Sequence, residues 1–480
     1  MSRQGEVLLG IGSGAALAFC VCLDPLVTRY LAIGFLPYMG STVLAVLLVV
    51  ATAVCLRLPA LTREGGRFAA MFVIIMAQFS GIALGKLDLL EVATVVFFGF
   101  WLIVAFVRTD RVIQLSPLSF FIIGLVFFVV LAAVNRPPLM SFVAIGEKFA
   151  LFLLVVDIVR NRAVVRTSAR LIVWAGVFSS LVALAQIVAY VAWGYVLTMG
   201  APEGNRQTFL KPTPFGDLVR ATGFFPNPAG LNDWLLVAAG LAMGACAATR
   251  ATRQRLLYAG AFTVIAAAIV VTWSTAALIA LAILVGLFAY VQRPSRTIQY
   301  TGVLVLLLVA GYLTGAVQHA SRWISSYGVA SGDVRLELLQ LGMSYLRNSP
   351  LIGIGVQNFG RVSGNYFPTG PWIFQYPVHN SFVQMATELG IPGGLVFLGF
   401  VAAVSLRLGA VLKRGRDEDK WIFKGFALGW VAVVVHMLSE PMAYEGTLWL
   451  ILGVMEGAMI TVLSARPHIA EDAARLRGAG

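Results

Sequence analysis

The chain has 480 residues, of which 59% are hydrophobic and only 12% are charged, whereas about 25% of the residues of a soluble globular domain are charged. Apolar runs of about 17 to 25 residues recur along the whole length, and each is long enough to cross ~30 Å of hydrocarbon. This composition excludes a soluble protein. The net charge of +13 does not indicate nucleic-acid binding, because the basic residues lie in short loops where positive-inside bias places them.

A membrane β-barrel is also excluded, since its alternating segments of about ten residues do not occur. We therefore predict an all-α, polytopic membrane protein with about fourteen spans. The first apolar run resembles a signal peptide, but many spans follow, so we expect it to stay uncleaved. The run over 256–291 is divided at Trp273, because one helix of about 36 residues would be ~54 Å long. The predicted spans are 7–23, 40–57, 68–86, 90–107, 116–134, 141–159, 170–193, 230–248, 256–272, 275–291, 299–316, 382–406, 421–439 and 446–464.

The loop charges predict the orientation. With the N-terminus in the cytoplasm, most of the 35 Lys and Arg residues fall in inner loops and both termini are cytoplasmic. Two long outer segments remain, 196–229 and 317–381, and shorter outer turns include 440–445. We predict a single integral membrane domain over 1–480. Because long loops escape the charge rule, their basic residues need another explanation.

His379 is the strongest candidate for proton transfer. It lies beside Asn380 at the outer end of span 382–406, and imidazole is the side chain that readily takes up a proton near neutral pH. The alternative is an interfacial histidine that caps the helix together with Asn380.

Basic residues of the outer segments are candidates for binding phosphate, because a guanidinium forms forked contacts with phosphate oxygens. The alternative for each is an exposed side chain that pairs with Asp217, Asp333 or Glu337, or that contacts lipid headgroups. Residues 334–346 have helical apolar spacing, so we expect Arg335 to begin a short amphipathic helix. The candidates are Arg206, Lys211, Arg220, Arg322, Arg335, Arg347 and Arg361.

No metal site or cofactor is predicted. The acidic triplet over 417–419 falls in a basic inner loop and is interpreted as a solvated charge cluster, and the glycines over 353–360 do not fit a nucleotide-binding pattern and predict a tight turn. Glu147 and Lys148 are the best intramembrane charges to support a site, since charges in lipid are usually paired and often functional; Asp233 and Glu456 are others. We expect buried single thiols at Cys20, Cys22, Cys55 and Cys246.

Two stretches resemble the O-antigen ligase / O-antigen polymerase superfamily. One runs from Arg335 through the Pro-Leu-Ile-Gly-Ile-Gly turn of 350–355 and the His379-Asn380 pair to Glu-Leu-Gly-Ile-Pro-Gly at 388–393. The other is Arg-Ala-Thr-Gly-Phe-Phe-Pro-Asn-Pro at 220–228. The motifs cover roughly residues 215 to 400, and they are specific only in combination. The chain departs from the superfamily at Ser274-Thr275, where many members have Ser-Arg.

The resemblance implies a GT-C-like glycosyltransferase in the bacterial inner membrane, with its active site facing the periplasm. Its donor would be a polyprenyl-pyrophosphate-linked glycan, transferred to an acceptor hydroxyl by a metal-independent, inverting displacement. Arg220 and Arg335 would bind the pyrophosphate and stabilise its charge as it leaves, and His379 would be the general base. Further substrate-binding positions would be Asn227, Arg347, Tyr376 and Asn380.

Three functions remain open. The first is a ligase that joins the glycan to a lipid A-core or another saccharide, which we favour slightly. The second is a polymerase that joins repeat units to each other, because the donor chemistry is shared. The third is a flippase or transporter of lipid-linked sugars, whose polar groups would be expected in broken spans rather than in two outer loops. A purely structural membrane protein accounts least well for His379 and the outer arginines.

Overall fold

The computed structural model describes residues 65–81, 83–84, 87–95, 97–98, 116–196, 210–213, 216–293, 335–366, 377–414 and 419–463. Within these residues, eight helices are long and apolar enough to cross a membrane. The prediction of an all-α polytopic membrane protein is confirmed, whereas the number fourteen stays a prediction. The eight are Pro117–Asn135 (α5 with the 3-10 helix η1), Arg162–Trp193 (α7), Pro228–Ala248 (α9), Thr252–Val271 (α10), Thr275–Gln292 (α11), Ser381–Arg414 (α15), Lys420–Met437 (α16) and Gly446–Leu463 (α17).

Most of the predicted boundaries agree with these helices. The break between α10 and α11 lies where the sequence predicts it, because Trp273 has a φ of 53° and Ser274 caps α11 by accepting from the Ala277 amide at 3.3 Å. The predicted spans 7–23, 40–57 and 299–316, and most of 90–107, lie outside the described residues.

The predicted span 68–86 is wrong at its end. Helix α3 covers Gly65–Ala77, and a hairpin of β1 (Ala83–Leu84) and β2 (Leu87–Asp88) follows. The helix does not continue through Gly81, because the Gly81 amide donates to the Phe224 carbonyl at 2.7 Å instead of to a carbonyl of the helix. A second hairpin, β3 (Leu210–Thr213) with β4 (Gly216–Val219), leads directly to Arg220.

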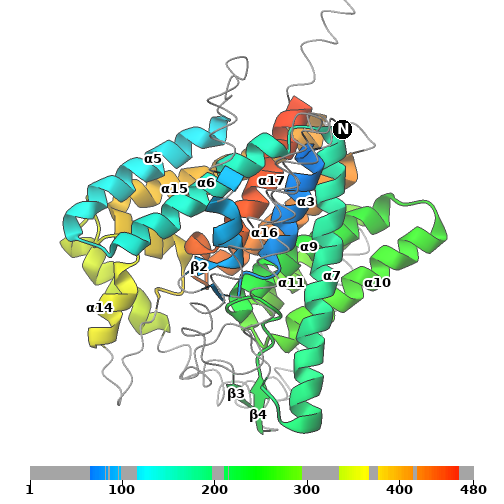
Figure 1. Cartoon of the computed structure of the whole chain (residues 1–480), viewed down its shortest axis with the longest axis horizontal. Coiled ribbons are helices and arrows are strands. Elements are labelled where there is room, and N and C mark those ends of the chain that lie inside the picture. Colours follow the sequence, from blue (N-terminus) through cyan, green and yellow to red (C-terminus); the bar gives the residue numbers. More distant parts are fainter. Residues whose placement is uncertain are drawn as a thin grey trace, which may run out of the picture.

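Helix α9 lies at the centre of the bundle, against α16, α10 and α7 (Figure 1). Small residues let α9 and α16 approach closely, as in many membrane helix pairs: a Cβ on Gly240 would lie 2.5 Å from the Gly425 carbonyl oxygen, and one on Gly244 would lie 2.5 Å from that of Trp421. Helix α6 (Leu139–Ile158) packs along α17, and α5 packs along α15. The first turns of α9 are therefore held in the middle of the molecule.

A separate small core lies beside this bundle. Residues 335–348 form the predicted amphipathic helix, and α14 covers Asn358–Tyr366. Their buried apolar side chains join the residue before His379 in one cluster, apart from the main core. The cluster consists of Leu338, Leu341, Phe359 and Val378.

Helix α15 is broken at Gly390, which has a φ of 77° and a ψ of 171°, two residues before Pro392. The turn of residues 350–355 fills the break. The Ile391 amide donates to the Pro350 carbonyl at 2.7 Å, and the Gly355 amide donates to the Glu388 carbonyl at 3.0 Å. The backbone groups freed by the break are thus satisfied by the turn that carries the glycines of the first motif.

Replacing Gly390 with alanine is expected to destabilise the protein by about 1–3 kcal/mol, because this φ/ψ region is essentially restricted to glycine. A Cβ here would also lie 2.4 Å from the Leu351 carbonyl oxygen. Thermal unfolding in detergent measures the effect. Gly409→Ala is the matched control, since it lies in the same helix and a Cβ there meets nothing within 4 Å. Equal melting temperatures for the two variants would contradict the prediction.

Candidate functional site

The short segment between α16 and α17, hereafter the 438–445 turn, carries the carboxylate at the centre of the site. Arg335 Nη2 donates to Glu440 Oε1 at 2.9 Å. His379 Nδ1 lies 3.5 Å from Glu440 Oε2, farther than an ordinary hydrogen bond, and has no hydrogen-bond partner among the described residues. Two of the predicted site residues, from two parts of the chain, therefore share one carboxylate.

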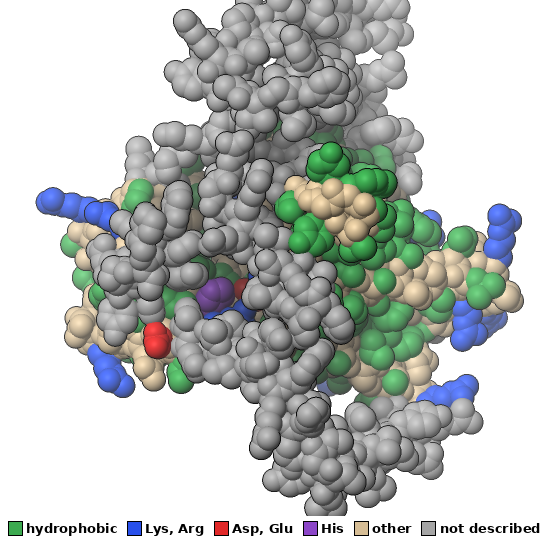
Figure 2. Space-filling model, turned by 90° about the horizontal axis from the view of Figure 1, so that it is seen from below, with side chains coloured by type: hydrophobic (Ala, Val, Ile, Leu, Met, Phe, Trp, Pro, Cys, Tyr) green, Lys and Arg blue, Asp and Glu red, His purple; other side chains and the backbone are tan. Residues whose placement is uncertain are grey.

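His379 is partly exposed, with 24% of its side chain accessible. In Figure 2 one histidine side chain is visible beside basic side chains. Of the two histidines in the described residues, His436 is fully buried and His379 is not. Since Nδ1 faces Glu440, the opposite ring nitrogen, Nε2, is left for a ligand.

Arg220 follows β4 and is half-buried. Its Nε donates to the Thr272 carbonyl at 3.2 Å, which the break between α10 and α11 leaves open. Burial lowers the pKa of Arg220, while the nearby negative charge of Glu440 acts in the opposite direction and the positive charge of Arg335 adds to the decrease. Arg220, Arg335, His379 and Glu440 therefore form one electrostatic group, which we call the Glu440 cluster.

Glu440 is the most buried member of the cluster, with 6% of its surface exposed. Burial alone would raise the pKa of its carboxyl group, but His379, Arg335 and His436 together outweigh burial and leave the pKa below its usual value. Opposite charges within a few ångströms favour the ionised form. The cluster thus holds an ionised carboxylate between cationic groups at neutral pH.

The backbone around Arg220 is fixed by Gln186, a buried side chain of α7. Gln186 Oε1 accepts from the amides of Thr222 and Gly223, both at 3.0 Å, and Nε2 donates to the Gly223 carbonyl at 2.8 Å. One side chain thus satisfies three backbone groups of the Arg220 motif. A φ of 58° at Gly223 gives this segment a shape that glycine adopts readily.

The two predicted substrate-binding asparagines both cap helices. Asn227 Oδ1 accepts from the Gly230 amide at 2.7 Å at the start of α9, and its Nδ2 donates to Glu445 at 3.1 Å. Asn380 Oδ1 accepts from the amides of Phe382 and Val383 at the start of α15, and its Nδ2 donates to the Leu438 carbonyl at 2.9 Å. Both amides tie a span to the 438–445 turn; a role in substrate binding stays a prediction.

The remaining predicted positions do not join the cluster in the described structure. Arg347 is exposed near the far end of the helix that starts at Arg335, about 18 Å along it at 1.5 Å per residue. Tyr376 lies outside the described residues. Asn358, at the start of α14, contacts η1 rather than the cluster, because its side-chain amide donates to the Asn135 carbonyl at 3.4 Å.

The Glu388 carboxylate lies beside the glycine turn of residues 350–355, whose own amides donate to backbone carbonyls, among them that of Glu388. Glu388 Oε2 accepts from the Gln357 amide at 2.8 Å and from the Tyr444 hydroxyl. Burial and the neighbouring Glu388 raise the pKa of Tyr444 well above its usual value, so the hydroxyl stays protonated and donates. Glu388 thereby connects the turn, α15 and η3 (Met442–Tyr444).

Glu147 and Lys148 pair with each other, and Lys148 acts electrostatically on Glu445 at the end of the 438–445 turn. Lys148 Nζ contacts Glu91 at 2.8 Å and Glu147 at 2.7 Å. Burial raises the pKa of Glu445, which Asn227 and Lys148 oppose. Within the described residues, no group of three or more His, Cys, Asp or Glu side chains is arranged to hold a metal ion.

Sequence reasoning missed Glu440, Glu445 and Gln186. The first two lie in a predicted outer turn only six residues long, and the carboxylates considered as partners of the outer arginines were Asp217, Asp333 and Glu337 instead. Both carboxylates could have been recognised from the free-energy cost of burying a charge beside two spans, because such a group needs an oppositely charged partner. The outer arginines were the available cationic partners. Gln186 has a weaker signal, a lone amide in an otherwise apolar span.

Comparison with known proteins agrees with the motifs. The family model described as O-antigen ligase matches residues 260–398, a range that contains Arg335, His379 and the glycine turn but neither Arg220 nor Glu440. No curated protein matches the chain. The matched range and the helical membrane architecture support the O-antigen ligase family.

Proposed function

We propose that the protein is a membrane glycosyltransferase of the ligase type, which transfers a glycan from a polyprenyl-pyrophosphate carrier to a hydroxyl of a lipid A-core or another saccharide. The observation that carries the proposal is the Glu440 cluster: the Arg335 guanidinium is paired with a buried carboxylate, an accessible imidazole lies beside that carboxylate, and Arg220 is near enough to interact with it electrostatically. The family match contributes the reaction class. We further propose that this site faces the periplasm, as the loop charges predict.

The arginines account for the donor half of the reaction. As the bond between the sugar C1 and the phosphate oxygen breaks, its electron pair leaves on the pyrophosphate, and Arg220 and Arg335 stabilise the charge that builds there. A guanidinium carries five N–H donors, so the contact of Arg335 with Glu440 through Nη2 leaves donors for phosphate oxygens. The carrier's prenyl chain stays in the bilayer.

His379 accounts for the acceptor half. Its Nε2 takes the proton of the acceptor hydroxyl while the hydroxyl oxygen forms the new bond to C1, on the face opposite the leaving group. Glu440 orients the ring through Nδ1 and stabilises the imidazolium that forms. Glu440 is thus a positioning residue for the general base.

Replacing Glu440 with glutamine is expected to slow transfer about tenfold, because the neutral amide no longer stabilises the imidazolium that forms when His379 takes the acceptor proton. The lowered pKa of Glu440 keeps the wild-type carboxylate ionised near neutrality, so the wild-type and variant proteins differ in charge at this position. The measurement is the initial rate across the pH range.

The control for this measurement is Glu337→Gln, which removes an exposed carboxylate two residues from Arg335. The control is expected to keep the wild-type profile. A Glu440→Gln profile that overlies the wild-type profile at equal rate would contradict the role of Glu440.

Transfer is expected to persist after treatment with EDTA, because cationic side chains neutralise the leaving pyrophosphate in this proposal. The measurement is initial rate in EDTA against an untreated sample. Loss of activity that a divalent ion restores would contradict the metal-independent displacement.

The test of the proposed function is reconstitution with a polyprenyl-pyrophosphate oligosaccharide, with and without a lipid A-core acceptor. A product anchored to lipid A-core supports the ligase. Longer glycans that stay on the polyprenyl carrier would assign a polymerase instead. Movement of the donor across the bilayer with no new glycosidic bond would overturn both.

A further inference from the structure

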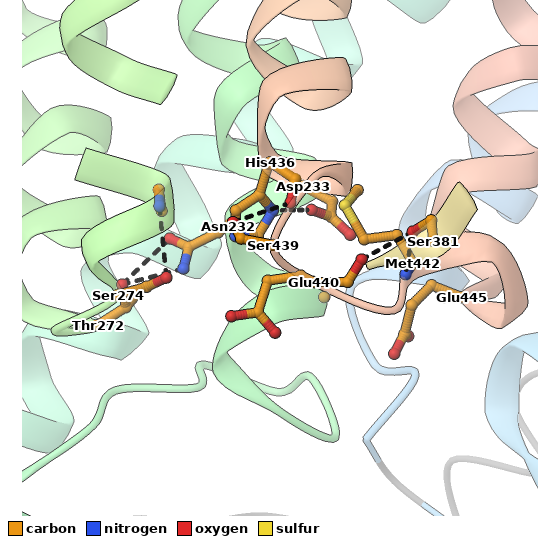
Figure 3. Close-up of polar contacts among 12 residues, drawn as sticks. Asn232, Asp233, Thr272, Ser274, Ser381, His436, Ser439, Glu440, Met442 and Glu445 are labelled. Atoms are coloured by element: carbon orange, nitrogen blue, oxygen red, sulfur yellow. Dashed lines mark hydrogen bonds and ion pairs between the residues drawn. The ribbon is translucent and has the colours of Figure 1, made fainter. Parts of the chain in front are cut away.

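Two adjacent buried side chains at the start of α9, Asn232 and Asp233, are linked by contacts to different members of the Glu440 cluster. Asn232 is linked to Arg220, and Asp233 is linked to Glu440. Both are fully buried, and neither belongs to a sequence motif discussed above. Figure 3 shows them at one helix end, with Asn232 directed toward Thr272 and Asp233 toward His436. Each residue begins a short chain of contacts that ends at a member of the cluster.

The first series of contacts runs from Asn232 through Thr272 to Arg220. Asn232 Nδ2 donates to Thr272 Oγ1 at 3.0 Å, and the Thr272 hydroxyl lies 3.2 Å from Asn232 Oδ1. The carbonyl of the same Thr272 accepts from Arg220 Nε at 3.2 Å. Asn232 therefore fixes the residue at the α10–α11 break whose carbonyl orients the guanidinium.

The second series of contacts runs from Asp233 through His436 and Ser439 to Glu440. Asp233 Oδ1 lies 2.6 Å from His436 Nδ1, and both side chains are fully buried. His436 lies in the last turn of α16, and its carbonyl accepts from the Ser439 amide at 3.0 Å, one residue before Glu440. Asp233 therefore fixes the helix end from which Glu440 extends.

Asn232, Asp233 and His436 lie on two tightly packed helices, α9 and α16. Helices α9 and α16 touch through glycines, so a shift of one helix past the other would bring backbone atoms into collision; a Cβ on Gly429 would lie 2.8 Å from Val237 Cα. A rigid helix positions side chains more accurately than a loop does. Through their contacts, Asn232 and Asp233 fix the positions of Arg220 and Glu440, which lie outside the helices.

We propose that Asn232 and Asp233 are positioning residues with divided roles: Asn232 orients Arg220 for the pyrophosphate, and Asp233 orients Glu440, and through it His379, for the acceptor proton. This inference rests on the proposed function. Neither residue touches substrate. The division follows from the geometry, because the two contact chains start at neighbouring residues and diverge.

The test measures steady-state transfer by the full-length protein in detergent, with a polyprenyl-pyrophosphate oligosaccharide as donor. Asn232→Leu and Thr272→Val are each expected to raise the donor KM about tenfold, with kcat and pH profile close to wild type. The double variant is expected to be no worse than either single variant, because residues acting in one contact chain are not additive. Thr272→Val keeps the test decisive if Asn232→Leu does not fold.

Asp233→Asn is expected to lower kcat several-fold and to leave the donor KM unchanged. Its effect should disappear in the Glu440→Gln background, where the group that it positions is already neutral. Glu456→Gln is the matched control, since it removes a fully buried carboxylate that contacts Arg407 at 2.9 Å and no member of the cluster. The control is expected to keep wild-type kcat and KM.

The inference is overturned if Asn232 and Thr272 variants change kcat instead of donor KM, or if Asp233→Asn slows Glu440→Gln further by its full factor. It is also overturned if folded Asn232 and Asp233 variants turn over like wild type. Failure of the proposed function is distinguishable, because then Arg220→Ala and Glu440→Gln themselves leave transfer unchanged.

Discussion

Replacing His379 with alanine is expected to slow glycan transfer by about 10²- to 10⁴-fold, the range that a positioned general base contributes. The imidazole is the one accessible proton acceptor beside Glu440 among the described residues. Without it, the acceptor hydroxyl must lose its proton to water. Initial rates with saturating donor and acceptor measure the change, and a raised rate at high pH would identify the lost step as deprotonation.

The protein is expected to fold normally in this variant, because His379 is partly exposed and the cap of α15 belongs to Asn380. Size-exclusion elution and melting temperature in detergent report on folding. Turnover of a folded His379→Ala protein at the wild-type rate would refute the assignment of the base. A fall in rate with an unfolded protein would instead support the structural alternative, a histidine that serves the helix start.

Replacing Arg335 with alanine is expected to reduce kcat/KM for the donor by about 10²- to 10³-fold, as for removal of one donor to a developing negative charge. Arg335→Lys should recover only a small part, because the ammonium keeps the charge but loses the fork. Arg220 is expected to behave in the same way. Steady-state kinetics with donor as the varied substrate measure both residues.

Loss of Arg335 also leaves Glu440 with one partner fewer, and an unpaired buried charge is itself destabilising. The double variant Arg335→Ala/Glu440→Gln separates the two effects: it is expected to restore stability but not donor use. Arg361→Ala is the control, an exposed arginine of α14 that should keep wild-type kinetics. Donor kinetics unaffected in both Arg220→Ala and Arg335→Ala would exclude a pyrophosphate clamp.

The fold was largely predictable from the sequence, because hydrocarbon thickness limits the length of a span and charge marks its ends. The break at Trp273 and the helix that starts at Arg335 follow from length and apolar spacing alone. The end of α3 did not, since Gly81 stops the helix by packing against Phe224, 143 residues away. Contacts between distant parts of the chain are not encoded in local periodicity.

The site was predictable in its cations and not in its carboxylate. Arg220, Arg335 and His379 could be singled out because charged groups in long outer segments need a reason. Nothing in the sequence around Glu440 singles it out, because it lies in a short turn. Its partners Arg335 and His379 are 105 and 61 residues away. The resemblance also ran from Arg220 to Gly393, and Glu440 lies beyond that region.

The separate small core has a consequence for how the site holds together. Arg335 and His379 are attached to the cluster of Leu338, Leu341, Phe359 and Val378, whereas Glu440 is attached to the main bundle. The Glu440 cluster therefore lies where the small core joins the main bundle, and the Arg335–Glu440 contact and the bond from Asn380 to the Leu438 carbonyl both cross that junction. In the proposed enzyme, the alignment of Arg335 and His379 with Glu440 thus depends on how the small core is fixed to the bundle, as well as on the packing within each.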